Sequence, residues 1–316
     1  MVKNKEKIVL LEHKPDVIYI GYQRAGSTFL RSYFSHHPDI QWTRISDYFE
    51  ANEKFYSPGY LYWDPNADKN TNKCVIDMYE AHATGFISGD KLEELEDASF
   101  YIKKQINATL HRDYFYPAPE EIARRIKDTI PDAKILLVLR NQVDWIRSNY
   151  LHRIVALPKR HKTFSDYIST RIGKTILFGG LFHDTVKIYY DLFGKDNVQV
   201  LLLEQFKRDR NAALKKMCRF LDVAFVEFPT DKEKRNKGFD NRVGNGIRKL
   251  SRLGLGISKS NSEGHILIRL LSKLKFLDGD VLTNKEKAFI RSFYAASNCH
   301  TSELLGIDLG AYGYPL

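Results

Sequence analysis

Short, mostly apolar runs of residues recur along this chain, with enough residues between them for helices. Four runs stand out, at residues 17–20, 74–78, 134–139 and 198–203. The runs at 134–139 and 198–203 hardly alternate between apolar and polar residues, so they predict strands buried on both faces, as in a parallel sheet. The run at 134–139 is the strongest strand signal in the sequence.

Between the runs, apolar residues recur every three or four positions, which predicts helices. The first predicted helix covers about 26–36, with Phe29, Leu30, Tyr33 and Phe34 on one face, and Pro38 ends it. Further helices are predicted from Pro119, at about 142–152, 163–172, 178–193 and 209–221, and after the capping box Thr283-Asn-Lys-Glu286. Residues 39–72 predict mostly loop, and 80–118 predict no element.

Strands that alternate with helices predict an α/β fold, with a central, mostly parallel sheet flanked by helices in three layers. We expect residues 1–316 to form a single domain, because 316 residues suit one large α/β unit. Ligands of such folds bind beyond the carboxyl ends of the strands. The loops that follow the runs at 17–20 and 134–139 should therefore share one crevice.

Composition narrows the class of protein. The hydrophobic fraction of 43% predicts a globular chain, and the three widely spaced cysteines predict neither a disulfide framework nor a metal site. No apolar run approaches the roughly 18 residues of a membrane span, and the start of the chain lacks a signal-peptide core. We therefore expect a cytoplasmic location, with peripheral contact at the inner face of the membrane left open by the net charge of +10.

The strongest chemical signal lies directly after the first strand, in Gly21-Tyr-Gln23-Arg24-Ala25-Gly26-Ser27-Thr28. A strand, a glycine-rich turn and a helix start in this order predict an anion site, because free N–H groups and the helix dipole meet there. The stretch nearly matches a P-loop, G-x-x-x-x-G-K-[ST], but Ser27 stands where that motif has lysine. The loop can therefore hold phosphate but is poorly equipped to transfer it.

A second anion site is predicted after the run at 134–139. Arg140 follows the strand directly, and Ser148 comes two turns into the next predicted helix. A guanidinium group binds phosphate oxygens with two parallel hydrogen bonds, and a hydroxyl adds a third donor. A surface ion pair would explain Arg140 alone, but its pairing with the first loop favours phosphate binding.

These two stretches resemble the 5′-phosphosulfate loop and the 3′-phosphate motif of sulfotransferases that use 3′-phosphoadenosine 5′-phosphosulfate (PAPS). The resemblance extends to Val200–Phe206, to Arg235-Asn-Lys237-Gly238 and to the tail ending Gly-Tyr314-Pro315. It implies a P-loop-like fold, PAPS as the donor, and no metal. It also implies cofactor-binding roles for Gly21, Gln23, Arg24, Ala25, Gly26, Ser27, Thr28, Arg140, Ser148, Arg235, Lys237 and Gly238.

Catalytic roles follow from the same resemblance. Arg24 takes the place of the family's cation beside the leaving phosphate. The general base is expected shortly after the first helix, where Asp47 lies about one residue from the family position. Glu50, Glu53 and His82 are the other candidates, and each candidate could instead be an ordinary loop charge or a structural histidine.

The sequence therefore predicts a PAPS-dependent sulfotransferase that acts on a hydroxyl group. The aromatic stretch at 56–63 favours a carbohydrate or glycoconjugate acceptor, such as a glycan or glycolipid, and no nucleic acid partner is expected. The basic segment at about 232–260 is expected to be a mobile loop or a lid that orders on an anion. Two alternatives remain: a P-loop-like nucleoside or small-molecule kinase, and a protein that binds polyanions or membrane through residues 232–275.

Overall fold

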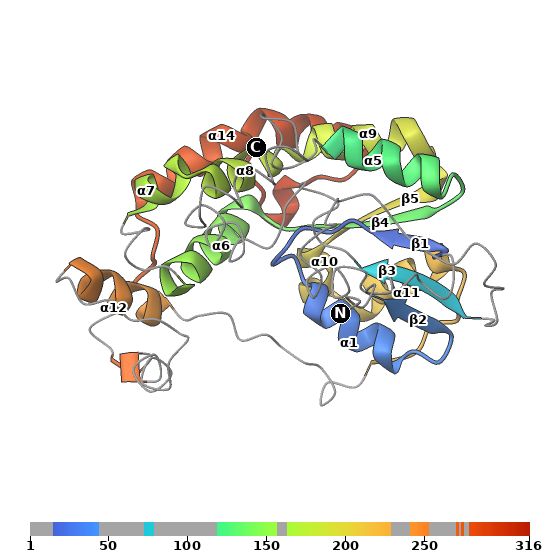
Figure 1. Ribbon diagram of the computed structural model, residues 1–316, viewed down its shortest axis with the longest axis horizontal. Coiled ribbons are helices and arrows are strands. Elements are labelled where there is room, and N and C mark those ends of the chain that lie inside the picture. The colour runs from blue at the N-terminus through green and yellow to red at the C-terminus, as the bar shows by residue number, and fades with distance from the viewer. Residues whose placement is uncertain are drawn as a thin grey trace, which may run out of the picture.

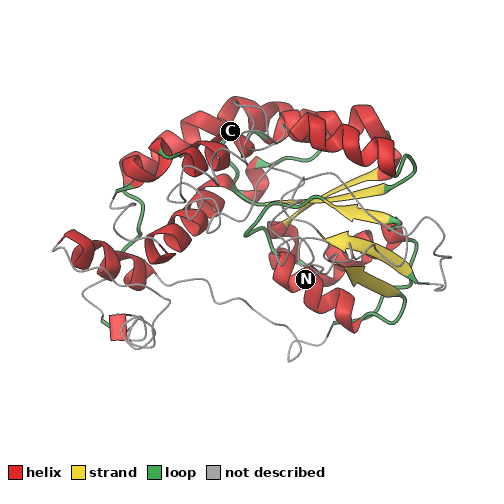
Figure 2. Ribbon diagram, in the orientation of Figure 1, coloured by secondary structure: helices red, strands yellow, loops and turns green. Residues whose placement is uncertain are grey.

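A five-stranded parallel sheet forms the centre of the molecule in the computed structural model (Figures 1 and 2). The structure describes residues 15–43, 73–78, 119–156, 163–228, 241–252, 270–271, 273–274 and 278–316. The strands are β1 (Val17–Tyr19), β2 (Ile40–Thr43), β3 (Cys74–Met78), β4 (Lys134–Leu139) and β5 (Val198–Leu202). The predicted α/β fold with a parallel sheet is confirmed.

The strand order is β2-β3-β1-β4-β5, so β1 lies in the middle of the sheet. The chain builds outward from β1 through β3 and β2 on one side, and then through β4 and β5 on the other. The direction in which strands are added to the sheet thus reverses next to β1. In α/β folds, a crevice forms beyond the carboxyl ends of the two strands between which this direction reverses. Here those strands are β1 and β4, which pair in parallel with Tyr19 opposite Leu136. The loop after β1 and the turn after β4 therefore meet at one edge of the sheet.

Both faces of β4 are buried, which explains its continuous apolar sequence. Successive side chains of a strand point to opposite faces of the sheet. Ile135, Leu137 and Leu139 join the larger core cluster, whereas Leu136 and Val138 join the smaller one. Figure 1 shows α5 (Pro119–Thr129) and α9 (Phe182–Phe193) over the first face, with α1 (Ser27–His36) and α11 (Arg210–Leu221) over the second.

Further helices extend the structure beyond the sheet, and they pack mainly on the side of the larger core. They are α6 (Gln142–Ala156), α7 (Phe164–Ser169), α8 (Arg171–Gly179), α10 (Leu203–Arg208), α12 (Asn241–Arg252) and α14 (Asn284–Leu305). Within the described ranges, no helix combines the length and the apolar character needed to cross a membrane.

The last helix, α14, begins where the sequence predicted. The Thr283 hydroxyl oxygen accepts from the N–H of Glu286, and the Glu286 carboxylate accepts from the N–H of Thr283, which completes the capping box. The helix packs along α9 and α6 and ends at Gly306 in the left-handed conformation. The chain then turns back, so that its final residues lie against the turn after β4.

Three local predictions were wrong, and one short helix was missed. Residues 40–43 form an edge strand instead of loop, and the helix predicted at 163–172 is two helices. The break falls at Thr170, whose extended backbone ends α7 and whose hydroxyl caps α8 by accepting from Gly173. The helix predicted from 178 begins at Phe182, after Gly180. The short helix α10 was not predicted.

The basic segment at 232–260 is also more ordered than a mobile loop over part of its length, because Asn241–Arg252 is helix α12. Glycine lowers helix propensity, and this segment contains Gly244 and Gly246 within the helix. Gly244 is buried where a Cβ atom would lie 2.4 Å from Cδ2 of Leu151 in α6, so the absence of a side chain allows the two helices to pack closely. Arg235, Lys237 and Gly238 lie outside the described residues.

Candidate active site

The loop between β1 and α1 presents the start of α1 at the edge of the sheet. Gly26 precedes the helix with φ of 99°, a left-handed conformation that favours glycine, and it offers no side chain to cap the helix. A Cβ atom at Gly26 would also lie 2.7 Å from Leu203. The first turn contains no acidic residue, while Ser27 is buried and Thr28 half-buried beside it. This geometry suits an anion at the helix terminus.

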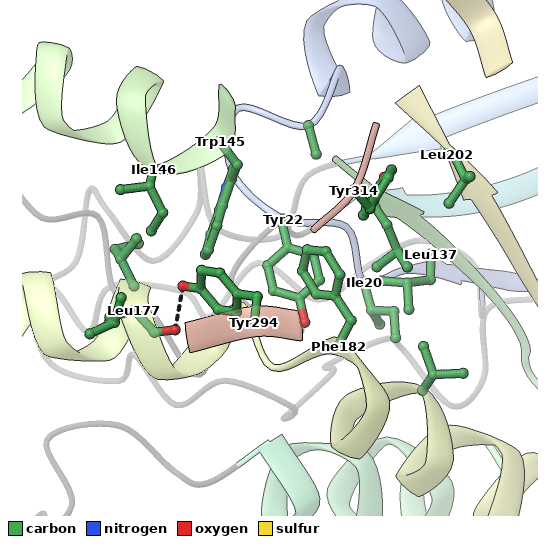
Figure 3. Packing of buried hydrophobic residues seen from close by; sticks show 14 of the residues in the cluster. Ile20, Tyr22, Leu137, Trp145, Ile146, Leu177, Phe182, Leu202, Tyr294 and Tyr314 are labelled. Atoms are coloured by element: carbon green, nitrogen blue, oxygen red, sulfur yellow. Dashed lines mark hydrogen bonds between the residues drawn. The ribbon is translucent and has the colours of Figure 1, made fainter. Parts of the chain in front are cut away.

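Three contacts hold this loop on its inner side. The indole N–H of Trp145 donates to the carbonyl oxygen of Gln23 at 2.7 Å, and the N–H of Ala25 donates to Tyr22 at 3.1 Å. The Tyr22 hydroxyl donates to Thr185 at 3.2 Å, so its ring is fixed in the core. Figure 3 shows Tyr22 between Trp145 and Phe182, and the rings of Tyr22 and Trp145 meet edge to face. The backbone of the loop is therefore positioned before any ligand arrives.

Arg140 joins the two predicted anion sites. It follows β4 directly, and its Nη1 donates to the carbonyl oxygen of Arg24 at 2.6 Å. Arg24 itself has φ of 64°, a left-handed conformation that is uncommon for a residue with a side chain. The structure thus brings Arg140 onto the loop after β1, as the shared edge of β1 and β4 requires.

The side chain of Arg140 is half-buried. Burial lowers its pKa, and the carboxylates of Asp144 and Glu204 counter part of that shift. Arginine stays protonated at neutral pH in any case, so the group is a fixed positive charge. Its Nε is buried and has no hydrogen-bond partner among the described residues. A buried donor without a partner is costly, and an anion at this position would satisfy it.

The structure describes some of the other predicted site residues and not others. Ser148 lies in the second turn of α6 and is half-buried, but within the described part of the chain its hydroxyl makes no hydrogen bond to Arg140 or to the loop. Gly21 cannot accept a larger side chain, since a Cβ atom would lie 2.0 Å from the ring of Tyr19. The candidate bases Asp47, Glu50, Glu53 and His82 lie outside the described residues.

Sequence reasoning missed the residues that support the site from the inside. Trp145 lies in the first turn of α6, and its indole N–H is a polar donor on an apolar ring, which is the signal that could have marked it. Tyr22 and Thr185 lie far apart in the sequence, so nothing there pairs them. Within the described ranges, no three His, Cys, Asp or Glu side chains gather as metal ligands.

The parallel sheet, the glycine-flanked loop and the half-buried arginine define an α/β protein with a candidate anion site at the point where its strand order reverses. A family model described as a sulfotransferase domain matches residues 14–269. The chain therefore belongs to the sulfotransferase family.

Individual relatives are distant. The chain is 23% identical over 282 residues to the bifunctional heparan sulfate N-deacetylase/N-sulfotransferase 1 of Caenorhabditis briggsae, with 82% of this chain and 28% of that protein covered. The chain thus spans just over a quarter of that relative's length. Its fold resembles the crystal structure of a sulfotransferase from Alicyclobacillus acidocaldarius, with a TM-score of 0.55, 21% identity, and coverage of 95% and 99% of the two chains. The crystal structure of a mouse sulfotransferase, SULT7A1, complexed with PAP (3′,5′-adenosine bisphosphate), gives a TM-score of 0.39 at 15% identity. The match covers 93% of this chain and 90% of the mouse chain.

The hydrogen bond from Trp145 to Gln23 predicts that a substitution at Trp145 lowers both stability and nucleotide affinity. Trp145→Phe keeps a ring against Tyr22 but removes the donor to Gln23, leaves that carbonyl unpaired and opens a small cavity. We expect the free energy of unfolding to fall by about 2–3 kcal/mol, measured in urea. Nucleotide affinity should fall as well, because the loop loses its inner anchor.

Trp42→Phe is the matched control for this substitution. Trp42 also donates through its indole N–H, to the Ser35 hydroxyl at 2.7 Å, but it is half-exposed at the edge strand β2. Water can replace that bond, so the control should cost less than about 1 kcal/mol and leave nucleotide binding unchanged. Equal losses in the two variants would contradict the anchoring role of Trp145.

Proposed function

We propose that this sulfotransferase transfers a sulfuryl group from PAPS to a hydroxyl group of a carbohydrate or glycoconjugate. The observation that carries the donor assignment is the 2.6 Å hydrogen bond from Arg140 to the Arg24 carbonyl. It supports one ligand with two phosphate positions, one at the start of α1 and the other at Arg140. PAPS has a 3′-phosphate as well as a 5′-phosphosulfate, whereas ATP lacks the former. Family membership also sets aside the kinase alternative.

The roles of the loop residues follow from where they lie. Gly21, Gln23, Ala25 and Gly26 would shape the backbone around the 5′-phosphate, while Ser27 and Thr28 would donate from the first turn of α1. Arg140 would bind the 3′-phosphate, with Ser148 beside it, and Arg235, Lys237 and Gly238 would close over the nucleotide. PAPS supplies an activated sulfuryl group, and its departing phosphate gains negative charge during transfer. Arg24 lies in the loop where it could stabilise that charge.

A carbohydrate acceptor is supported by the heparan sulfate named for the Caenorhabditis briggsae relative. The aromatic stretch at 56–63 is consistent with it, since aromatic faces suit sugar rings. We propose the cytoplasm as the compartment; none of the three cysteines forms a disulfide, which is compatible with reducing conditions.

Incubation of the purified chain with ³⁵S-labelled PAPS tests donor and acceptor together. We expect label on polysaccharide or glycolipid acceptors at rates about tenfold or more above those on simple phenols and peptides. Excess EDTA should leave the rate unchanged, because fixed donors of the protein replace a metal at the phosphates. Faster transfer to phenols would contradict the carbohydrate assignment, and a requirement for Mg²⁺ would contradict metal-free transfer.

Arg24→Ala should separate catalysis from binding. Because its contribution grows with charge on the leaving phosphate, kcat should fall about a hundredfold or more. The Kd for 3′,5′-adenosine bisphosphate (PAP), measured by calorimetry, should change only a few-fold. Arg24→Lys retains the charge and should recover part of the rate. Arg124→Ala is the control, since Arg124 pairs with Glu120 on the exposed surface of α5. A parallel loss of binding and rate would refute a transition-state role for Arg24.

We propose Asp47 as the general base, with Glu50, Glu53 and His82 as the alternatives. Asp47→Asn keeps the size of the side chain but removes its proton acceptor, so kcat should fall about a hundredfold or more with PAP affinity unchanged. The matched variant Glu50→Gln should stay near wild-type activity. The reverse pattern, measured in single-turnover assays, would assign the base to Glu50.

A further inference from the structure

The end of the chain is fastened to the turn after β4. The Asn141 side-chain amide donates to the carbonyl oxygen of Gly313, and the Asn298 amide donates to that of Pro315 at 2.8 Å. Between these two bonds, the hydroxyl of Tyr314 donates to Oε2 of Glu204 at 2.9 Å. Tyr314 and Pro315 are buried. We refer to this arrangement as the C-terminal clasp, which consists of Asn141, Glu204, Asn298 and the tail Gly313–Pro315.

The clasp lies directly beside Arg140. Asn141 is the next residue, and its backbone N–H donates to Oε1 of Glu204 at 3.3 Å. The negative charge of Glu204 acts on the Arg140 guanidinium group. Lys207 also lies 3.8 Å from Oε1 of Glu204, and Asp144 is the other carboxylate that acts on Arg140. The carboxylate of Glu204 is therefore close enough to Arg140 to compete with a ligand for the guanidinium N–H groups.

Both oxygens of Glu204 are already engaged. Oε1 accepts from the Asn141 N–H and Oε2 accepts from the Tyr314 hydroxyl. Burial raises the pKa of Tyr314, with a smaller effect from Glu204, so the hydroxyl keeps its proton and remains a donor at neutral pH. If that hydroxyl were absent, the released oxygen could pair with the neighbouring guanidinium, since such charge-assisted bonds are strong. That pairing would compete directly with an anion.

We propose that Tyr314 is a positioning residue that keeps Glu204 away from Arg140, so that the guanidinium is available to the 3′-phosphate of the donor. The buried and unpartnered Nε of Arg140 supports this, because it shows a donor that the protein itself leaves unsatisfied. The proposal rests on the proposed assignment of the 3′-phosphate to Arg140. It makes the last residues of the chain a determinant of nucleotide specificity.

The test compares two nucleotides that differ by one phosphate. The full chain is titrated calorimetrically with PAP and with adenosine 5′-monophosphate, which has no 3′-phosphate. Tyr314→Phe removes the hydroxyl and keeps the ring beside Phe182. We expect the variant to bind PAP about tenfold more weakly, the loss of roughly one charge-assisted bond, and the monophosphate within about twofold of wild type.

Tyr294→Phe is the matched control. Tyr294 is fully buried in the same core. Its hydroxyl donates to the Leu177 carbonyl oxygen at 2.6 Å, as Figure 3 shows, whereas that of Tyr314 donates to Glu204. It should leave the ratio of the two affinities unchanged, even where it lowers stability. Asn141→Ser provides a second route to the clasp. It can keep an oxygen for the Val143 N–H while removing the amide that holds Gly313, and it should shift the ratio in the same direction as Tyr314→Phe.

The outcomes separate the two proposals. Equal weakening of both nucleotides in Tyr314→Phe, or an unchanged ratio, would refute the positioning role while the 3′-phosphate assignment stood. A wild-type protein that binds the two nucleotides equally well would overturn the assignment of Arg140, and the role of the clasp with it. Thermal unfolding of each variant confirms that the folded protein is being titrated, and the ratio of affinities is unaffected by a simple loss of stability.

Discussion

The hydrogen bond from the Arg140 guanidinium to the Arg24 carbonyl is the contact on which the site depends. It joins the end of β4 to the loop after β1, two segments 116 residues apart in the sequence. Because β1 and β4 are parallel neighbours, their carboxyl ends lie at one edge, and the bond needs no distortion of the sheet. Arg24, which accepts this bond, is in a left-handed conformation next to the helix start, so one interaction links both candidate anion-binding features.

The nature of the loop agrees with sulfuryl transfer rather than phosphoryl transfer. A kinase of the P-loop type needs a lysine on its phosphates and an acid that holds Mg²⁺. This loop has Ser27 in place of that lysine, and its positive charge comes instead from Arg24 within the loop and from Arg140 across the sheet edge. Arg24 and Arg140 follow two different strands, which suits a ligand with separated phosphate groups better than a linear triphosphate.

The sequence was enough to predict most strands and the loop after β1, but not the edge strand, helix α12 or the position of the tail. The strands β1, β4 and β5 were predictable because each is a mostly apolar run, and the loop was predictable because glycines and hydroxyls follow one such run directly. The strand β2 was missed because Ile40-Gln-Trp-Thr43 alternates between apolar and polar residues over only four positions and so forms no continuous apolar run. Helix α12 was missed because Gly244 lowers helix propensity, while its close packing on Leu151 is a tertiary effect. The tail could not be assigned to the site, since Tyr314 and Glu204 are 110 residues apart.

A functional requirement explains why the protein keeps the half-buried charge of Arg140 with an unsatisfied Nε donor. Withdrawing a guanidinium group from water destabilises the free protein, and an unpartnered Nε adds to that cost. A full ion pair with Glu204 would remove both costs, yet Glu204 is bonded to Asn141 and Tyr314 instead. Such an arrangement makes sense where function requires the charge to be free, because strain or lost stability at a site is retained when a ligand relieves it. The C-terminal tail is then a structural element that maintains this state, at a distance along the chain that no local pattern reveals.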